Sequence, residues 1–223
     1  AAAGDERVEL TGVWTHFATA DANDEAFLRE QLDRFRQVAV PIAERHPEVC
    51  LHAANSAATL RGREFHLGMV RCGIAIYGLD PFGRDPAAHD LEPALSLHTY
   101  VADVKRIEAG ASVGYGRTWR APADTWIGVL PVGYGDGFRR GLSNACDVLV
   151  GDARRPLVGT ISMDNVTIDL GPETEVEAGA PAVLIGEQDG ERVAAEELAA
   201  ALGTINYEIP CGLSARVPRA YRA

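Results

Sequence analysis

The spacing of apolar residues changes near Asp80, and this change constrains the fold more than any other feature of the sequence. Before it, short apolar runs alternate with a helical stretch; after it, short apolar runs follow one another with turns between them. Strands that alternate with helices are typical of a parallel sheet, whereas successive short strands are typical of an antiparallel β-domain. The 223 residues are therefore expected to form an α/β part followed by a mainly β part.

The α/β part contains three apolar runs that predict strands, at residues 13–17, 49–53 and 69–77. Residues 24–44 carry apolar side chains close to the 3.6-residue spacing of an amphipathic helix. Ser56 is expected to cap a second, short helix. These units are too few to close an eight-stranded barrel.

The β part begins after a linker that is rich in proline and glycine. A helix is expected in it over residues 194–202, closed by Gly203. Its strands are expected at residues 95–107, 125–131, 147–150, 157–161, 166–170 and 182–185.

The acidic composition limits the partners of the chain. It has 21 basic and 32 acidic residues, a net charge of −11, and no basic cluster for nucleic acid or an anionic membrane surface, so neither is expected as a partner. No apolar run approaches the roughly 20 residues of a membrane span, and residues 1–6 lack the features of a signal peptide. The four cysteines lie far apart, which predicts neither a metal site nor a disulfide framework and favours the cytoplasm.

Polar side chains occur near the end of each predicted parallel strand. They are His16, then Asn55 and Ser56, then Arg71. Ligands of α/β proteins gather at the carboxyl ends of strands, so one shared site is expected there. The alternatives are that His16 is a core histidine and that Ser56 is only a helix cap. Arg71 requires a buried acceptor or a ligand, because its guanidinium stays charged inside an apolar run.

Two features of this site suit an anion. Ser56 begins a predicted helix, and Gly73 and Ile74 offer backbone N–H groups where glycine permits close approach. A phosphate would fit this cradle, although the pattern is far weaker than a Walker or Rossmann motif.

The β part holds three further candidates. Tyr115 and Tyr134 each stand between two glycines, and Met163 precedes Asp164 after an apolar run. A phenol has an ordinary pKa of about 10, so a tyrosine that acts as a base near neutral pH needs a partner. The alternatives are that Tyr115 packs on a strand and that Met163 fills the core.

Seven segments together resemble alanine racemase, a pyridoxal-phosphate enzyme, and they occur in the order of that family. They are THFATAD at 15–21, HAANSAA at 52–58, VRCGIAIYGL at 70–79, VGYGRT at 113–118, PVGYGDG at 131–137, SMD at 162–164 and INYEIPC at 205–211. The resemblance implies the last part of a TIM-type (β/α)8 barrel over residues 1–85 and a β-rich C-terminal domain over residues 86–223.

The resemblance also implies roles for individual residues. Arg71 would meet the pyridine nitrogen of pyridoxal 5′-phosphate, and Tyr115 would remove the α-proton of L-alanine with His16 hydrogen-bonded to it. Asn55 would lie near the cofactor. Ser56, Gly73, Ile74 and Tyr207 would hold its phosphate, and Tyr134, Met163 and Asp164 would line the substrate entrance.

The family forms a head-to-tail homodimer in which the tyrosine base comes from the partner subunit, and the same is expected here. The lysine that forms the Schiff base in the family belongs to a segment before residue 1. Lys105, the single lysine of this sequence, lies on a predicted solvent-facing strand and does not replace it. The expected function is therefore interconversion of L- and D-alanine, supplying D-alanine for peptidoglycan, with the 223 residues inactive by themselves.

Two alternatives remain open at the level of the sequence. In the first, the chain is a non-catalytic cofactor-binding or dimerisation module. In the second, it is part of a racemase that acts on another amino acid such as serine.

Overall fold

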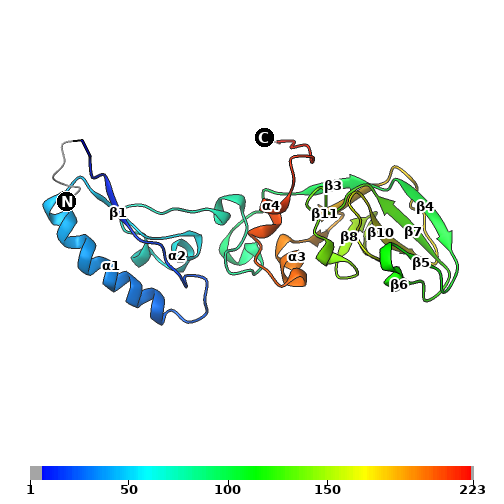
Figure 1. Ribbon diagram of the computed structural model, residues 1–223, viewed down its shortest axis with the longest axis horizontal. Helices are drawn as coiled ribbons and strands as arrows, with labels where there is room; N and C mark the ends of the chain where they lie inside the picture. Colours follow the sequence, from blue (N-terminus) through cyan, green and yellow to red (C-terminus); the bar gives the residue numbers. More distant parts are fainter. Residues whose placement is uncertain (1–6, 222–223) are drawn as a thin grey trace. The chain divides into compact units, whose positions relative to one another are not determined.

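A computed structural model describes residues 7–221, so the expectation that residues 1–6 form no signal peptide lies outside it. The chain divides into two compact units, with the boundary between Glu92 and Pro93 (Figure 1). No helix within the described residues is long and apolar enough to cross a membrane.

The first unit begins with a strand, helix, strand and helix, as the sequence predicts. These are β1 (Gly12–Trp14), α1 (Ala26–Arg45), β2 (Cys50–His52) and α2 (Ser56–Arg61), and β1 pairs in parallel with β2. Helix α1 buries one stripe of apolar side chains because they recur every three or four residues. This stripe consists of Leu28, Leu32, Phe35 and Ala39.

The strand expected over residues 69–77 is wrong. Met69 makes a single parallel bridge to His52, and Arg71 N–H donates to Ala54 O over 2.8 Å. The chain then turns at Gly73 into a short 3₁₀-helix, Ile74–Tyr77. A short apolar run does not distinguish a buried strand from other buried backbone, and here the glycine ends the extended conformation.

The second unit is mainly β, as expected. Its three-stranded antiparallel sheet has β7 (Thr125–Leu130) in the centre, between β4 (Asp103–Ile107) and β10 (Val166–Gly171). In β10 the buried positions alternate with half-buried ones, which is the period of a sheet with one covered face.

A five-stranded sheet contains most of the remaining strands of the second unit (Figure 1). Its path runs β12 (Glu191–Val193), β11 (Pro181–Gln188), β8 (Asp147–Val150) and β9 (Ala153–Pro156), and β3 (Leu97–Tyr100) also pairs with β11. The short strands β5 (Ser112–Val113) and β6 (Trp119–Arg120) pair with each other, and two helices follow, α3 (Ala195–Leu202) and α4 (Glu208–Gly212).

The strand expected over residues 157–161 is also wrong. Leu157 makes one bridge to Ile168, and Gly159 then adopts a φ of +79°. Leu157, Val158 and Ile161 are nevertheless buried, so the apolar run reflects burial and not a continuous strand. The predicted end of the helix at Gly203 is confirmed, since this residue has a φ of +66°.

Candidate functional site

Arg71 lies at the centre of the polar groups of the first unit. Its Nη2 donates to Thr15 O over 2.9 Å and to Ala53 O over 3.3 Å, so it reaches the backbone beyond both β1 and β2. Its guanidinium also lies over the ring of Trp14, 5.1 Å from the centroid. The expectation that Arg71 meets acceptors is therefore confirmed.

Two histidines share the same guanidinium. Arg71 Nη1 lies 2.6 Å from His52 Nδ1, and Nη2 lies 3.2 Å from His16 Nδ1. Because a guanidinium only donates, both Nδ1 atoms act as acceptors when these contacts are made. Burial, and then the charge of Arg71, lower the pKa of His52. His16 is exposed, so it is not a core histidine.

Ser56 connects α2 to the turn that follows Arg71. Its side chain is buried, and Ser56 Oγ accepts from Gly73 N–H over 2.9 Å and from Ala75 N–H over 3.3 Å. A Cβ added at Gly73 would meet nothing within 4 Å, so this glycine faces open space. Because Ser56 Oγ accepts both bonds, its hydroxyl proton is left to donate toward this open space, which suits an anion.

Asn55, and not Ser56, caps helix α2. Asn55 Oδ1 accepts from Ala58 N–H over 3.0 Å, and Ser56 is the first helical residue. The cap is thus one residue earlier than expected. The Ser56 hydroxyl does not cap the helix and instead accepts from the backbone of the Gly73 turn.

In the second unit, Tyr115 stands on a turn that its glycines shape. Gly114 and Gly116 have φ values of +73° and +72°, and a Cβ at Gly114 would lie 2.8 Å from Thr160 N. The Tyr115 side chain is 73% exposed, so it does not pack on a strand. Tyr115 lines a hollow of about 400 Å³ together with Gly114, Thr160, Ser162, Asn165 and Thr167.

Asn144 connects this turn to another segment of the same chain. Its Nδ2 donates to Thr118 Oγ1 over 3.1 Å, and its Oδ1 accepts from Gly159 N–H over 2.6 Å. Asn144 therefore ties Thr118, at the end of the turn that carries Tyr115, to the segment around Gly159.

Tyr134 and Met163 lie on two loops that pair through their backbones. Tyr134 N–H donates to Ser162 O over 3.1 Å, and Gly135 N–H donates to Met163 O over 2.9 Å. Both side chains are exposed, so Met163 does not fill the core. Asp164 is engaged by Arg216, whose Nη2 lies 2.6 Å from Asp164 Oδ1.

The residues that the sequence singles out fall into two sets. His16, Ser56, Arg71 and the Gly73 turn are brought together in the first unit, with Asn55 at the cap of α2. Tyr115, Tyr134, Met163 and Asp164 lie in the second unit, where Tyr207 directly precedes α4.

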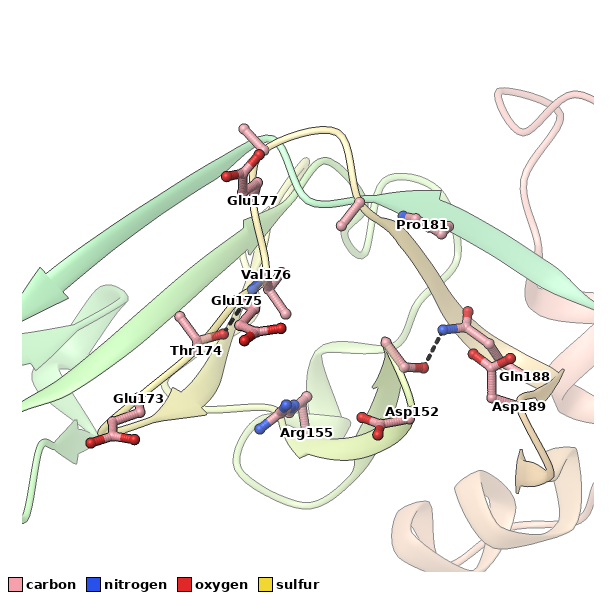
Figure 2. A pocket seen from close by; sticks show the side chains of 13 residues that line it. Asp152, Arg155, Glu173, Thr174, Glu175, Val176, Glu177, Pro181, Gln188 and Asp189 are labelled. Atoms are coloured by element: carbon pink, nitrogen blue, oxygen red, sulfur yellow. Dashed lines mark hydrogen bonds between the residues drawn. The ribbon is translucent and has the colours of Figure 1, made fainter.

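A second hollow of the β-rich unit is unsuited to an anion. It measures about 1170 Å³, and acidic side chains dominate its lining (Figure 2). Arg155 Nη1 already donates to Leu170 O over 3.0 Å. None of the residues predicted from the sequence lines this hollow, and its carboxylates would repel a phosphate or a substrate carboxylate. These carboxylates belong to Asp152, Glu173, Glu175, Glu177 and Asp189.

Sequence reasoning missed His52, Asn144 and Arg216. His52 ends an apolar strand beside Asn55 and Ser56, which was an available signal. Asn144 and Arg216 form hydrogen bonds to segments that are distant in the sequence, so no local sequence pattern predicts their role.

Comparison with known proteins gives the family. The model of the alanine racemase N-terminal domain matches residues 1–81, and that of the alanine racemase C-terminal domain matches residues 94–221. The chain belongs to the alanine racemase family.

Curated relatives and solved structures agree with this assignment. The chain is 44% identical to alanine racemase of Frankia casuarinae over 219 residues, which are 96% of this chain and 56% of that protein. It is 41% identical to alanine racemase 1 of Bacillus subtilis over 96% of this chain and 54% of that protein.

The alanine racemase structure from Streptomyces lavendulae, a producer of D-cycloserine, matches with a TM-score of 0.90 and 40% identity over 97% of this chain and 57% of that one. The Bacillus anthracis enzyme, solved with bound L-Ala-P, matches with a TM-score of 0.84 and 40% identity over 95% and 55%. The chain thus spans slightly more than half the length of the relatives it matches.

Proposed function

We propose that this chain carries most of the active site of an enzyme that interconverts L-alanine and D-alanine. The observation that supports it best is the joining of Arg71, His16 and the Ser56 cradle in one unit that belongs to the alanine racemase family. The first unit would be the last part of a (β/α)8 barrel, and the second the β-rich C-terminal domain.

The residues of the first unit fit pyridoxal phosphate. Ser56 Oγ with the N–H groups of Gly73 and Ile74 would hold the phosphate, where open space in front of Gly73 leaves room for it. Tyr207 would add its hydroxyl. Arg71 would donate to the ring nitrogen and, because a guanidinium keeps its proton, would leave that nitrogen unprotonated. When bound, the cofactor makes the α-proton of the amino acid acidic.

The tyrosine turn supplies the base for one face of the substrate. Tyr115 would take the α-proton of L-alanine, and its exposed side chain on a fixed turn suits a group that must reach a site beyond its own unit. Because His16 Nδ1 accepts from Arg71, its proton lies on Nε2, and this N–H would donate a hydrogen bond to the Tyr115 oxygen and so assist the proton transfer. A head-to-tail homodimer would bring Tyr115 of one subunit to Arg71 of the other.

Substrate selection would fall to the two paired loops. Tyr134 and Met163 would crowd the side-chain side of the site and favour the methyl group of alanine. This arrangement supports alanine over serine or a larger amino acid.

The second base of this two-base reaction would be a lysine outside these 223 residues. Lys105 lies on β4, exposed, with its Nζ 3.9 Å from Asp103 Oδ2. We therefore expect the 223 residues alone to be inactive. The D-alanine product would serve cell-wall peptidoglycan, and the four free cysteines favour a cytoplasmic location.

A racemase assay of the holoenzyme tests this proposal. By holoenzyme we mean this chain together with the segment that carries the lysine, with pyridoxal phosphate bound. Incubation with L-alanine should yield D-alanine until the two are equal, because enantiomers have the same free energy in water. Arg71→Lys keeps the charge but loses the planar fork, and should lower the rate strongly. The proposal fails if holoenzyme that binds pyridoxal phosphate produces no D-alanine, or racemises serine while leaving alanine unchanged.

A further inference from the structure

We propose that Arg216 is a positioning residue that clamps together the two loops carrying Tyr134 and Met163, and that Asp164 serves this clamp instead of contacting substrate. The inference rests on the proposed function for its effect on catalysis. The clamp itself consists of Arg216, Asp136 and Asp164.

One guanidinium joins two carboxylates from different loops. Arg216 Nη2 lies 2.6 Å from Asp164 Oδ1, and Arg216 Nε lies 3.3 Å from Asp136 Oδ1. The hydrogen bond to Asp164, followed by the charges of Asp136 and Asp164, raises the pKa of Arg216. Arg216 thus bridges the loop after β7 and the loop before β10.

The carboxylate of Asp136 is itself built into its loop. Its Oδ2 accepts from Gly133 N–H over 3.0 Å, and its side chain is only 15% exposed. Asp136 O also accepts from Ser214 N–H over 2.9 Å, which attaches the C-terminal segment that carries Arg216. Asp136 therefore joins its own loop to the C-terminal segment, and Arg216 of that segment adds the loop of Asp164.

The backbone between the two loops leaves room for the guanidinium. A Cβ at Gly135 would lie 2.5 Å from Arg216 Nη1, so a larger residue there would push the guanidinium away. Gly135 and Tyr134 are the two residues whose N–H groups donate to the opposite loop. The clamp consequently lies directly beside the hydrogen bonds that hold Tyr134 next to Met163.

This arrangement differs from an ordinary surface ion pair. Isolated exposed pairs contribute little, as expected for Arg106 and Asp124 on the same unit, whose side chains are both at least half exposed. The clamp instead joins three charged groups, one of them largely buried, and ties three segments. Its partner Asp164 has its carboxylate directed to Arg216, which leaves Tyr134 and Met163 to contact the substrate.

The test compares four forms of the holoenzyme: Arg216→Gln, Asp164→Asn, the double variant, and Arg106→Gln as the matched loss of an exposed Arg–Asp pair. Amide hydrogen exchange at Tyr134 and Gly135 reports the clamp whether or not the protein is a racemase. It should speed up by about tenfold or more in Arg216→Gln and stay unchanged in Arg106→Gln. Unchanged exchange at both amides in Arg216→Gln would overturn the clamp.

Kinetics separate the role of Asp164 from direct substrate binding. The two single variants should raise KM for alanine by a similar factor, about threefold to tenfold, with a smaller change in kcat, and the double variant should lose no more than either. The preference for alanine over serine should fall in parallel. Additive losses would mean that Asp164 meets the substrate directly, and an unchanged preference would mean that the clamp does not position Tyr134 and Met163. Absence of racemase activity in the unmodified holoenzyme would refute the proposed function, while the exchange rates would still decide the clamp.

Discussion

Arg71 Nη1 lies 2.6 Å from Nδ1 of His52, and this contact requires a neutral imidazole. The guanidinium has no acceptor atom and no proton to lose, so His52 must offer a lone pair at Nδ1. A protonated His52 would bring two positive groups into contact. The orientation of Arg71 therefore depends on the protonation state of a histidine that also stacks on Trp14, with ring centroids 6.3 Å apart.

The first prediction concerns the loss of folding stability at acidic pH. Burial and the charge of Arg71 lower the pKa of His52 in the folded state, so the unfolded chain takes up the proton first, below its ordinary pKa of about 6.5. The contribution of His52 to the free energy of unfolding is then full above this pH and declines as pH falls from about 6.5 toward the folded pKa. Urea unfolding between pH 7.5 and 5.5 should show a smaller loss of stability in His52→Gln than in the unmodified chain. Identical pH dependence in both proteins would contradict this account, since the other five histidines are common to them.

The second prediction concerns Ser56→Ala. Loss of the buried hydroxyl leaves the N–H groups of Gly73 and Ala75 without this acceptor and should cost about 1–3 kcal/mol of stability. It should also weaken binding of pyridoxal phosphate to the holoenzyme, measured by absorbance titration. Ser143→Ala is the matched control, because Ser143 Oγ likewise accepts from Ile161 N–H and donates to Arg140 O. Equal affinity for the cofactor in both variants would remove Ser56 from the phosphate site.

The third prediction concerns the stability of the first unit. Within residues 7–221, β1 and β2 form a sheet of two strands, extended only by the bridge between His52 and Met69. Sheets of two strands are marginal, whereas β7 is paired on both sides. In the 223-residue chain, amide exchange should therefore be at least about a hundredfold faster in β1 and β2 than in β7. Equal protection in the three strands would show that the first unit needs no further strands.

The sequence predicted the elements whose patterns are local. Helix α1 follows its apolar stripe, and β8 occupies the predicted residues 147–150 because they form a buried run bounded by a turn. The strand predicted at 69–77 is absent because the backbone leaves the extended conformation at Gly73, and the side chains of Met69, Ile76 and Tyr77 are exposed. The strand predicted at 157–161 is absent because its apolar side chains are buried while Gly159 turns the backbone away. The polar strand β9 was missed for the opposite reason, since its pairing with β8 does not depend on apolar side chains.

The candidate site was predictable where one residue stood out against its surroundings. A charged Arg71 inside an apolar run demanded acceptors, and the structure supplies them. The residues that support the site were hidden, because the side chains of Asn144 and Arg216 bond to residues at least 15 positions away in the sequence. Such contacts arise from the tertiary fold and leave no periodic trace.

The fourth prediction concerns Lys105. Its exposed side chain on β4 has only a distant ion pair with Asp103, so Lys105→Arg should change the unfolding free energy by less than about 0.5 kcal/mol. Racemase activity of the holoenzyme should stay unchanged as well. Borohydride reduction of the 223-residue chain with pyridoxal phosphate, followed by peptide mapping, should give no stoichiometric label on Lys105. Stoichiometric labelling together with racemase activity would show that Lys105 is the cofactor lysine.

The central claim is that Tyr115 removes the α-proton of L-alanine, and Tyr115→Phe tests it because the ring remains while the phenol is lost. Tyr100→Phe, another exposed tyrosine of the same unit, is the control. The measurement is incorporation of solvent deuterium into each enantiomer by the holoenzyme in single-turnover experiments. We predict that abstraction from L-alanine falls by about 10² to 10⁴ in Tyr115→Phe, while abstraction from D-alanine is much less affected. Equal loss for both enantiomers, or no loss for either, would contradict the assignment of Tyr115 as the base for L-alanine.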